Sequence, residues 1–318
     1  MLASIRRYPA ANVVIVFVMV QLACILASLM FPESFFYLSD ANMAALLDSI
    51  PILGIISLGV GLLMICGEFD LSVGSTVVVA ALVMGRLYDF GVNPWIGAVA
   101  ALFVGGSVGL LNGWLVMTLS LPSFIVTLGG MLFWKGIGLL ISGARQIKFQ
   151  PEGVFGAVAY SKVWVIPSTF VWFVGFAAFF HVLLMHRRLG NHIFAVGGNK
   201  DAANAIGINV RNVRYAAFAI CGVMAALAGI LSSGRLGSIS PTMGSNYELD
   251  AIAACVVGGI ALTGGRGSIV AVFLGVILLN IIRDVLLLVG APGLYLSIFV
   301  GALIVVAAAL NQAFRPKH

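Results

Sequence analysis

The chain has 318 residues, of which 61% are hydrophobic and only 9% are charged, and its mean hydropathy is +1.13. Soluble domains carry roughly 25% charged residues, so this composition leaves too little polar surface to face water. The net charge of +6 does not indicate nucleic-acid binding, because Lys and Arg stand at the ends of apolar segments and not on one face. The composition predicts an all-α polytopic membrane protein with a single transmembrane domain over residues 1–318.

Apolar segments follow one another along the chain, separated by polar, Pro and Gly clusters. A helix needs about 20 mostly apolar residues to cross the hydrocarbon core, which gives room for about ten spans. Some of them are expected to be broken helices, because the eighth is short and only the sequence GEFD separates the second from the third. The predicted spans are 12–31, 43–65, 71–88, 95–118, 122–142, 164–185, 214–233, 250–263, 268–289 and 293–311.

The first segment is expected to be a retained helix, since it is long for a signal peptide and lacks a clear small-residue cleavage site. Basic residues predict the orientation of the spans. Basic residues flank the whole set of spans, which fits an even number of spans with both termini in the cytoplasm. This orientation also places the basic segment 186–214 inside. Segment 143–163 then falls outside although it holds three basic residues. The flanking residues are Arg6, Arg7, Arg315 and Lys317.

An internal repeat is indicated by two similar stretches. Leu110 to Asn112 precede Pro122 at a distance like that at which Leu278 to Asn280 precede Pro292. Five spans separate the two copies, and an odd number inverts the second copy in the membrane, as is common in transporters. Chance similarity between low-complexity apolar segments is the alternative.

Two carboxylates, Glu68 and Asp70, stand between apolar runs, where an ionised group costs about 3 kcal/mol or more. One interpretation is a helix break at which Asp70, Ser72 and Ser75 line a translocation pathway. The other is a tight turn with Asp70 or Ser72 as an ordinary helix N-cap. Both interpretations are compatible with the sequence.

Small and hydroxylated residues mark two further spans. Ser123 and Thr127 share one helical face, which suits either a hydroxylated ligand or structural hydrogen bonds between helices. Gly105, Gly109 and Gly113 recur at four-residue intervals and predict a close helix–helix contact.

The segment 235–250 is expected to be an outside connection that ends in Glu248 and Asp250 at the mouth of the short eighth span. It either meets a partner or solute, or is a solvated loop before a helix. Arg283 and Asp284 are adjacent within the ninth span and cannot face one another, so each needs another partner.

Nothing in the chain predicts catalysis or a metal site. The GGRGS sequence at 264–268 lacks the spacing of a phosphate-binding loop, and no nucleophile–base arrangement or HExxH pair occurs. The histidines lack ligand spacing, because the chain is expected to become a loop after Arg188. The four cysteines are predicted to be packing residues without disulfides or zinc. No cofactor is expected.

Four stretches in register resemble the membrane permease subunit of bacterial ABC importers of the ribose, xylose and arabinose type, within the branched-chain amino acid and sugar permease family. The similarity runs from about residue 40 to residue 311. These stretches are GEFDLSVGS (67–75), LPSFIVTLGGM (121–131), FAVGGNKDAANAIGINVRNVR (194–214) and RLGSISPTMGSNYELDAIAACVVGGIALTGGRGS (235–268).

The resemblance implies a permease for a monosaccharide in the bacterial inner membrane, working by alternating access. Its expected partners are a second permease subunit, identical or different, a cytoplasmic ATP-binding subunit, a periplasmic sugar-binding protein and membrane lipid. ATP hydrolysis is expected on the separate subunit. Autoinducer 2 or a nucleoside is the alternative solute, and an ion-coupled secondary transporter is the alternative class. The Arg283-Asp284 pair departs from the uncharged residues usual in relatives, which leaves the solute open.

The resemblance also implies that segment 186–214 is the coupling loop, with a short helix around 200–206 that sits in a groove of the ATPase. Glycines would let the chain turn at either end of this helix, Asn199 would cap it, and its alanines would keep it slim. The residues assigned to coupling are Gly197, Gly198, Asn199, Lys200, Ala202, Ala203, Gly207, Ile208 and Arg211. The residues assigned to the pathway are Asp70, Ser72, Ser75, Asn112, Ser123, Thr127, Glu248, Asp250 and Asn280.

Overall fold

The computed structural model describes residues 11–291 together with 295, 298–299, 301–302 and 305. The predicted tenth span and the basic residues that flank the set lie largely outside this part of the chain. The helices are α2 (Ala11–Met30), α3 (Asp40–Ile65), α4 (Val73–Asp89), α5 (Pro94–Leu119), α6 (Ser123–Ser142), α7 (Gly153–Tyr160), α8 (Ser168–His186), α9 (Arg188–Gly198), α10 (Lys200–Ala205), α11 (Val210–Leu236), α12 (Tyr247–Val257) and α13 (Ile269–Leu288). The strands are β1 (Ile147–Lys148), β2 (Lys162–Val163), β3 (Ile166–Pro167) and β4 (Ser238–Ile239).

Seven of the described helices are long and apolar enough to cross a membrane: α2, α3, α5, α6, α8, α11 and α13. The prediction of an all-α polytopic membrane protein is therefore confirmed. α4 has 17 residues and α12 has 11, so at 1.5 Å per residue they extend roughly 26 and 17 Å, less than the hydrocarbon thickness of about 30 Å.

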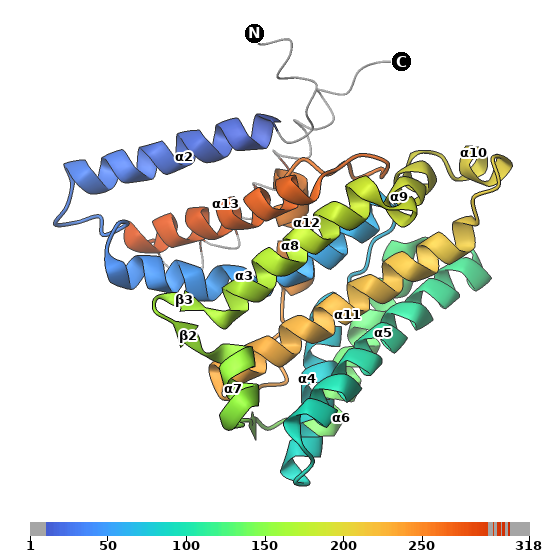
Figure 1. The fold of residues 1–318 in the computed structure, drawn as a ribbon, viewed down its shortest axis with the longest axis horizontal. Helices are drawn as coiled ribbons and strands as arrows, with labels where there is room; N and C mark the ends of the chain where they lie inside the picture. Colours follow the sequence, from blue (N-terminus) through green and yellow to red (C-terminus); the bar gives the residue numbers. More distant parts are fainter. Residues whose placement is uncertain (1–10, 292–294, 296–297, 300, 303–304, 306–318) are drawn as a thin grey trace.

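The core is built around α3 and α11, whose apolar stretches are mostly buried within the chain, whereas those of α2 and α6 are mostly exposed. α5 runs beside α11 (Figure 1) and the glycine stripe lies in this contact. A Cβ on Gly105 would lie 2.4 Å from the Gly222 carbonyl oxygen, and one on Gly109 would lie 2.2 Å from that of Phe218. The predicted close helix packing is confirmed. All four cysteines are buried, as expected of packing residues.

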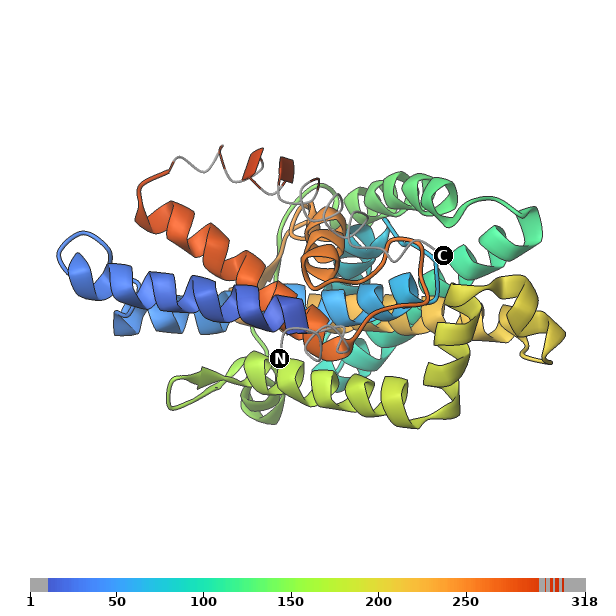
Figure 2. The ribbon, with the colours of Figure 1, turned by 90° about the horizontal axis from the view of Figure 1, so that it is seen from above.

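Two sets of connections lie at opposite ends of α11 (Figure 1). At its N-terminal end lies α10, and a Cβ on Gly265 would lie 2.6 Å from Gly198 Cα, so the connection 258–268 reaches the same side as α9 and α10. At its C-terminal end β4 pairs antiparallel with β1, so the connections before α7 and before α12 share the opposite side. We call these the α10 side and the hairpin side. Seen from above, α2 lies in front of α3, between α13 and α8 (Figure 2).

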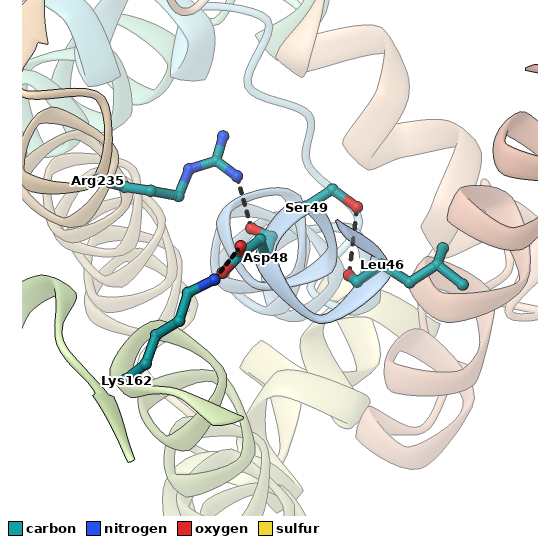
Figure 3. Close-up of polar contacts among 5 residues, drawn as sticks. All are labelled: Leu46, Asp48, Ser49, Lys162 and Arg235. Atoms are coloured by element: carbon teal, nitrogen blue, oxygen red, sulfur yellow. Dashed lines mark hydrogen bonds and ion pairs between the residues drawn. The ribbon is translucent and has the colours of Figure 1, made fainter. Parts of the chain in front are cut away.

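A polar cluster ties three elements together on the hairpin side (Figure 3). Lys162 of the β2–β3 hairpin forms an ion pair of 2.7 Å with the Asp48 carboxylate of α3. Arg235, in the last turn of α11, donates to the Asp48 carbonyl oxygen at 2.7 Å. These contacts join α3, α11 and the hairpin. Both cations are largely exposed, so the pairs contribute little to stability and mainly fix the position of the hairpin.

Candidate translocation and coupling site

The chain breaks between α3 and α4, where the sequence placed two carboxylates. Gly67 has a φ of +83°, which glycine adopts without steric cost, and the Glu68 amide donates back to the Leu63 carbonyl oxygen at 3.1 Å. The chain then runs non-helically to Ser72. Glu68 is 3% exposed and Asp70 is 1% exposed, so both carboxylates need internal partners.

Asp70 is held by hydrogen bonds from its own turn and from α5. Its Oδ1 accepts from the Ser72 amide at 2.8 Å and from Ser72 Oγ at 2.6 Å. Asn112 of α5 donates to both Asp70 oxygens at 3.3 and 3.4 Å and to Ser72 Oγ at 2.8 Å. Ser72 is the N-cap residue of α4, but its side chain makes no capping hydrogen bond. The Asp70, Ser72 and Asn112 side chains thus form one closed network.

The other predicted pathway hydroxyls of this region also have backbone partners. Ser123 Oγ, at the start of α6, accepts from the Phe69 amide at 3.0 Å. Thr127 donates to the Ser123 carbonyl oxygen at 2.8 Å, and Ser75 donates to the Met131 carbonyl oxygen at 2.7 Å. In this conformation Ser123 joins α6 to the break and Ser75 joins α4 to α6, whereas Thr127 bonds only within its own helix.

A second break brings the N-terminus of α12 against the N-terminus of α4. A Cβ on Gly74 would lie 2.4 Å from the Gly244 carbonyl oxygen and 2.3 Å from Glu248 Oε2. The Glu248 carboxylate thus lies at the first turn of α4, where the helix dipole favours an anion. Ser245 and Asn246 beside it are exposed. Two helices too short to cross the membrane thus begin at one point, next to exposed polar groups. Broken helices of this kind are common at the solute sites of transporters.

The remaining predicted pathway residues, Asp250 and Asn280, lie on α12 and α13. Asp250 forms an ion pair with Arg283, and Asn42 of α3 donates to Asp284 at 2.8 Å. The two adjacent charges of α13 therefore each have a partner on another helix, as the sequence required. Asn280 donates to the Val276 carbonyl oxygen of its own helix at 2.9 Å.

The segment 186–214 is more ordered than a loop. The expected short helix is present as α10, and Asn199 Oδ1 caps it by accepting from the Ala202 amide at 2.9 Å. Gly207 turns the chain after α10 with a φ of +85°. The expectation of a loop after Arg188 was wrong, because α9 is helical over Arg188–Gly198 and buries Ile193 and Val196.

Glu68 joins the break to this segment, and the sequence reasoning did not assign it to any site. Its Oε1 lies 2.7 Å from Lys200 Nζ of α10 and 2.8 Å from a guanidinium nitrogen of Arg214 of α11. One buried carboxylate therefore forms ion pairs with two basic residues, each more than 130 positions later in the sequence. Such pairs between distant residues leave no pattern in a single sequence.

Backbone contacts reinforce the same junction. A Cβ on Gly197 would lie 1.9 Å from the Ile65 carbonyl oxygen, and that oxygen accepts from the Gly265 amide at 2.8 Å. A Cβ on Gly264 would lie 2.7 Å from Gly67 Cα. Gly197 is thus needed for close approach inside α9, and not for the turn that the sequence suggested. We call residues 65–68, 197–200 and 264–265 the three-segment junction.

Lys135 was also missed by the sequence reasoning, although a charged residue inside a span is a recognisable signal. It lies exposed on α6, within the candidate span Ser123–Ser142. No cluster of three or more His, Cys, Asp or Glu side chains that could hold a metal ion occurs among the described residues. His181 and His186 are 6.5 Å apart between ring centroids.

Seven apolar helices long enough to cross a membrane, together with the shorter α4 and α12, define a polytopic membrane protein. The chain belongs to the family described as the permease component of the branched-chain amino acid transport system, whose model matches residues 42–308. The chain is therefore a transport permease component.

Three curated relatives have related names. The ribose import permease protein of Escherichia coli K12 is 33% identical over 276 residues, which cover 85% of each chain. The D-allose transport system permease protein of the same organism is 33% identical over 298 residues, covering 93% of this chain and 90% of the relative. The autoinducer 2 import system permease protein of Salmonella paratyphi B is 35% identical over 257 residues, covering 80% and 74%. No solved structure matches the chain.

Proposed function

We propose that this chain is the membrane-spanning permease subunit of an ATP-driven ABC importer that moves a monosaccharide by alternating access. The observation that carries the proposal is the three-segment junction. It connects α10, which offers an exposed surface to a partner, with Glu68 in the segment that leads into α4. Glu68 lies two residues before Asp70. A displacement of α10 is thereby transmitted to α4, whose first turn lies against the Glu248 carboxylate.

The proposed mechanism uses differential binding. An ATPase dimer that binds α10 differently in its open and closed forms shifts the permease between outward-open and inward-open states by that difference in affinity. The nine residues from Gly197 to Arg211 named above are assigned to this coupling. Ala203 is buried and supports α10 from within, so the exposed members form the ATPase contact. α10 suits it, because Ala202, Ala205 and Ile206 are exposed and small or apolar.

We assign to the pathway the nine residues from Asp70 to Asn280 named above. Some are proposed to contact the solute directly, and others are proposed to position the helices that carry them. Glu248, with the exposed groups at 245–246, is placed to meet the solute directly. Asp70, Ser72 and Asn112 stand behind the start of α4 and set its position. A sugar with several hydroxyl groups matches a site of carboxylate, amide and hydroxyl groups, and weak binding there suffices when a separate protein captures the solute.

The proposed topology has ten spans, with α4 and α12 as broken passes and residues 293–311 as the last. Support comes from the connections, which alternate between the α10 side and the hairpin side. This alternation requires α4 to pass from one side to the other. Gly67, before α4, lies on the α10 side, and the hydroxyl of Tyr88, in the last turn of α4, donates to the Gln150 carbonyl oxygen on the hairpin side. The termini and the α10 side are then cytoplasmic, in the bacterial inner membrane. The inverted five-helix repeat stays part of this proposal.

The proposed assembly contains a second permease subunit, a cytoplasmic ATP-binding subunit that hydrolyses the ATP, and a periplasmic sugar-binding protein. Support comes from the names of the relatives, which are import or transport systems for ribose, D-allose and autoinducer 2. Autoinducer 2 stays as the alternative solute because its permease matches at 35% identity.

Co-purification and reconstitution test this function. The tagged chain is isolated from its own cells, the associated subunits are identified by mass spectrometry, and the recovered complex is placed in vesicles. We expect ATP-dependent uptake of ribose or allose, with autoinducer 2 assayed in parallel. A vesicle that holds the chain alone, under a proton gradient, is the control. Uptake by the chain alone would show an ion-coupled transporter and overturn the proposal.

A further inference from the structure

A cavity of about 660 Å³ lies between the C-terminal end of α5, α10 and the start of α11. Polar and basic side chains of α10 and α11 line most of it, and Met117 of α5 lines one edge. Its basic members are Lys200, Arg211 and Arg214, and its one acidic member is Asp201. Glu68 lies behind them and pairs with Lys200 and Arg214. Three cations against two carboxylates leave the cavity with one positive charge.

Arg211 supplies the charge that remains. Within the described part of the chain its guanidinium has no carboxylate within ion-pair distance, and its contacts are to Tyr215, by a hydrogen bond of 3.3 Å and by stacking 5.7 Å from the ring centroid. Tyr215 therefore orients the guanidinium and leaves the charge unneutralised. Arg214 also lines the cavity, and its buried Nε has no hydrogen-bond partner among the described residues. An anion with several oxygen atoms can accept hydrogen bonds from both guanidinium groups.

The cavity continues onto an exposed apolar face of α5. Met117 belongs to a candidate membrane span, and Trp114 and Leu110 precede it by three and seven residues, so the three side chains share one helical face. Trp114 and Leu110 are 47% and 44% exposed. An apolar strip that leads from a span into a basic cavity at its end matches an amphiphile with a phosphate headgroup and acyl chains.

The cavity and the proposed ATPase contact share Lys200, Gly207, Ile208 and Arg211, but the exposed apolar surface of α10 lies on another face. Lys200, Asp201 and Asn204 line the cavity. Ala202 and Ile206 are exposed and do not line it. α10 therefore has one face toward the cavity and another free for a partner, and an occupant of the cavity would fix the angle at which α10 is presented.

We propose that this cavity binds the phosphate group of an anionic phospholipid, with Arg211 and Arg214 holding the phosphate oxygens and the strip Leu110–Trp114–Met117 contacting the acyl chain. The proposal needs neither a particular solute nor a particular ATPase, since it rests on the α5–α10–α11 geometry alone. Lipid bound here makes α10 part of the membrane interface.

The test uses the full chain, delipidated in neutral detergent and titrated with dioctanoyl phosphatidylglycerol or dioctanoyl phosphatidylcholine, with bound lipid counted by native mass spectrometry. We expect saturable binding of one phosphatidylglycerol that raises the thermal midpoint, and no such effect of phosphatidylcholine. Arg211→Gln should raise the dissociation constant about fivefold, the loss expected for one basic residue at a membrane surface. Arg211 is exposed, so the variant keeps the fold.

Arg188→Gln is the matched control, because Arg188 is exposed in the same polar segment but does not line the cavity. It should bind phosphatidylglycerol like the unmodified chain. Equal binding of both lipids, or equal weakening by both substitutions, overturns the site. A third titration uses inorganic phosphate. Stabilisation by phosphate equal to that by phosphatidylglycerol would assign the cavity to a soluble anion and overturn the lipid.

Discussion

Glu68 connects the break after α3 to both α10 and α11. It is a nearly buried carboxylate that compensates one cation of α10 and one of α11. A buried ion pair contributes little net stability, but removal of one partner leaves the others uncompensated and costs about 3–5 kcal/mol. The role of Glu68 is therefore to fix which segments meet, and loss of its charge should separate them.

Glu68→Gln should reduce ATP-driven uptake at least tenfold while the chain still reaches the membrane. Gln keeps the shape but leaves Arg214, which is 16% exposed, without a counter-charge, whereas Lys200 is 46% exposed and can be hydrated. α10 therefore loses its charged contact with the break at a cost of about 1–3 kcal/mol, most of it at Arg214. Uptake per ATP hydrolysed, measured in reconstituted vesicles, reports this loss directly. Glu33→Gln is the control, since Glu33 is exposed before α3. Normal coupling in Glu68→Gln would remove the junction from the mechanism.

Two helical glycines offer a sharper pair. A Cβ on Gly197 of α9 would lie 1.9 Å from the Ile65 carbonyl oxygen, whereas one on Gly175 of α8 has no atom within 4 Å. Gly197→Ala should therefore force α9 off the end of α3 and uncouple hydrolysis from uptake, because a backbone contact cannot give way as a side chain can. Gly175→Ala adds the same methyl group outside the coupling residues and should transport normally. Equal behaviour of the two variants contradicts the close approach.

At the scale of elements, the continuous apolar helices were predictable from hydropathy and the breaks from the polar residues inside them. α9 was missed because its polar residues suggested a loop, although Leu189, Ile193 and Val196 recur at helical spacing, a pattern that predicts one buried face. The pairing of Glu68 with Lys200 was beyond reach, since nothing local specifies a partner 132 residues away.

The α5–α11 contact gives an element-scale prediction. Gly109→Ala should lower the thermal midpoint by roughly 3–10 °C, because its methyl group meets the Phe218 backbone and overpacking of this kind costs about 1–3 kcal/mol. Thermal unfolding in detergent measures it. Gly129→Ala on α6, where a Cβ meets nothing within 4 Å, is the matched control and should leave the midpoint within a few degrees. A midpoint unchanged in Gly109→Ala would show that the helices lie further apart.

At the scale of the whole molecule, the connections form two groups at opposite ends of α11 (Figure 1). α10 and the junction lie at one end, and the Asp48 cluster with the β2–β3 hairpin lies at the other. The sequence predicted the same division by counting spans, against the basic residues of segment 143–163. One of these, Lys162, pairs with Asp48, so its charge is partly compensated by the fold. A charge count along the sequence cannot include such a pair.

Labelling of single cysteines tests both the division and its direction. Asn204→Cys on α10 and Gln146→Cys before β1 are exposed, whereas all four native cysteines are buried and give a low background. A membrane-impermeant maleimide added to intact spheroplasts, with the chain expressed without its partners, should label Gln146→Cys only. In inverted vesicles it should label Asn204→Cys only. The reverse pattern would place α10 outside, where no ATPase can reach it, and labelling of both from one side would contradict the separation of the two ends.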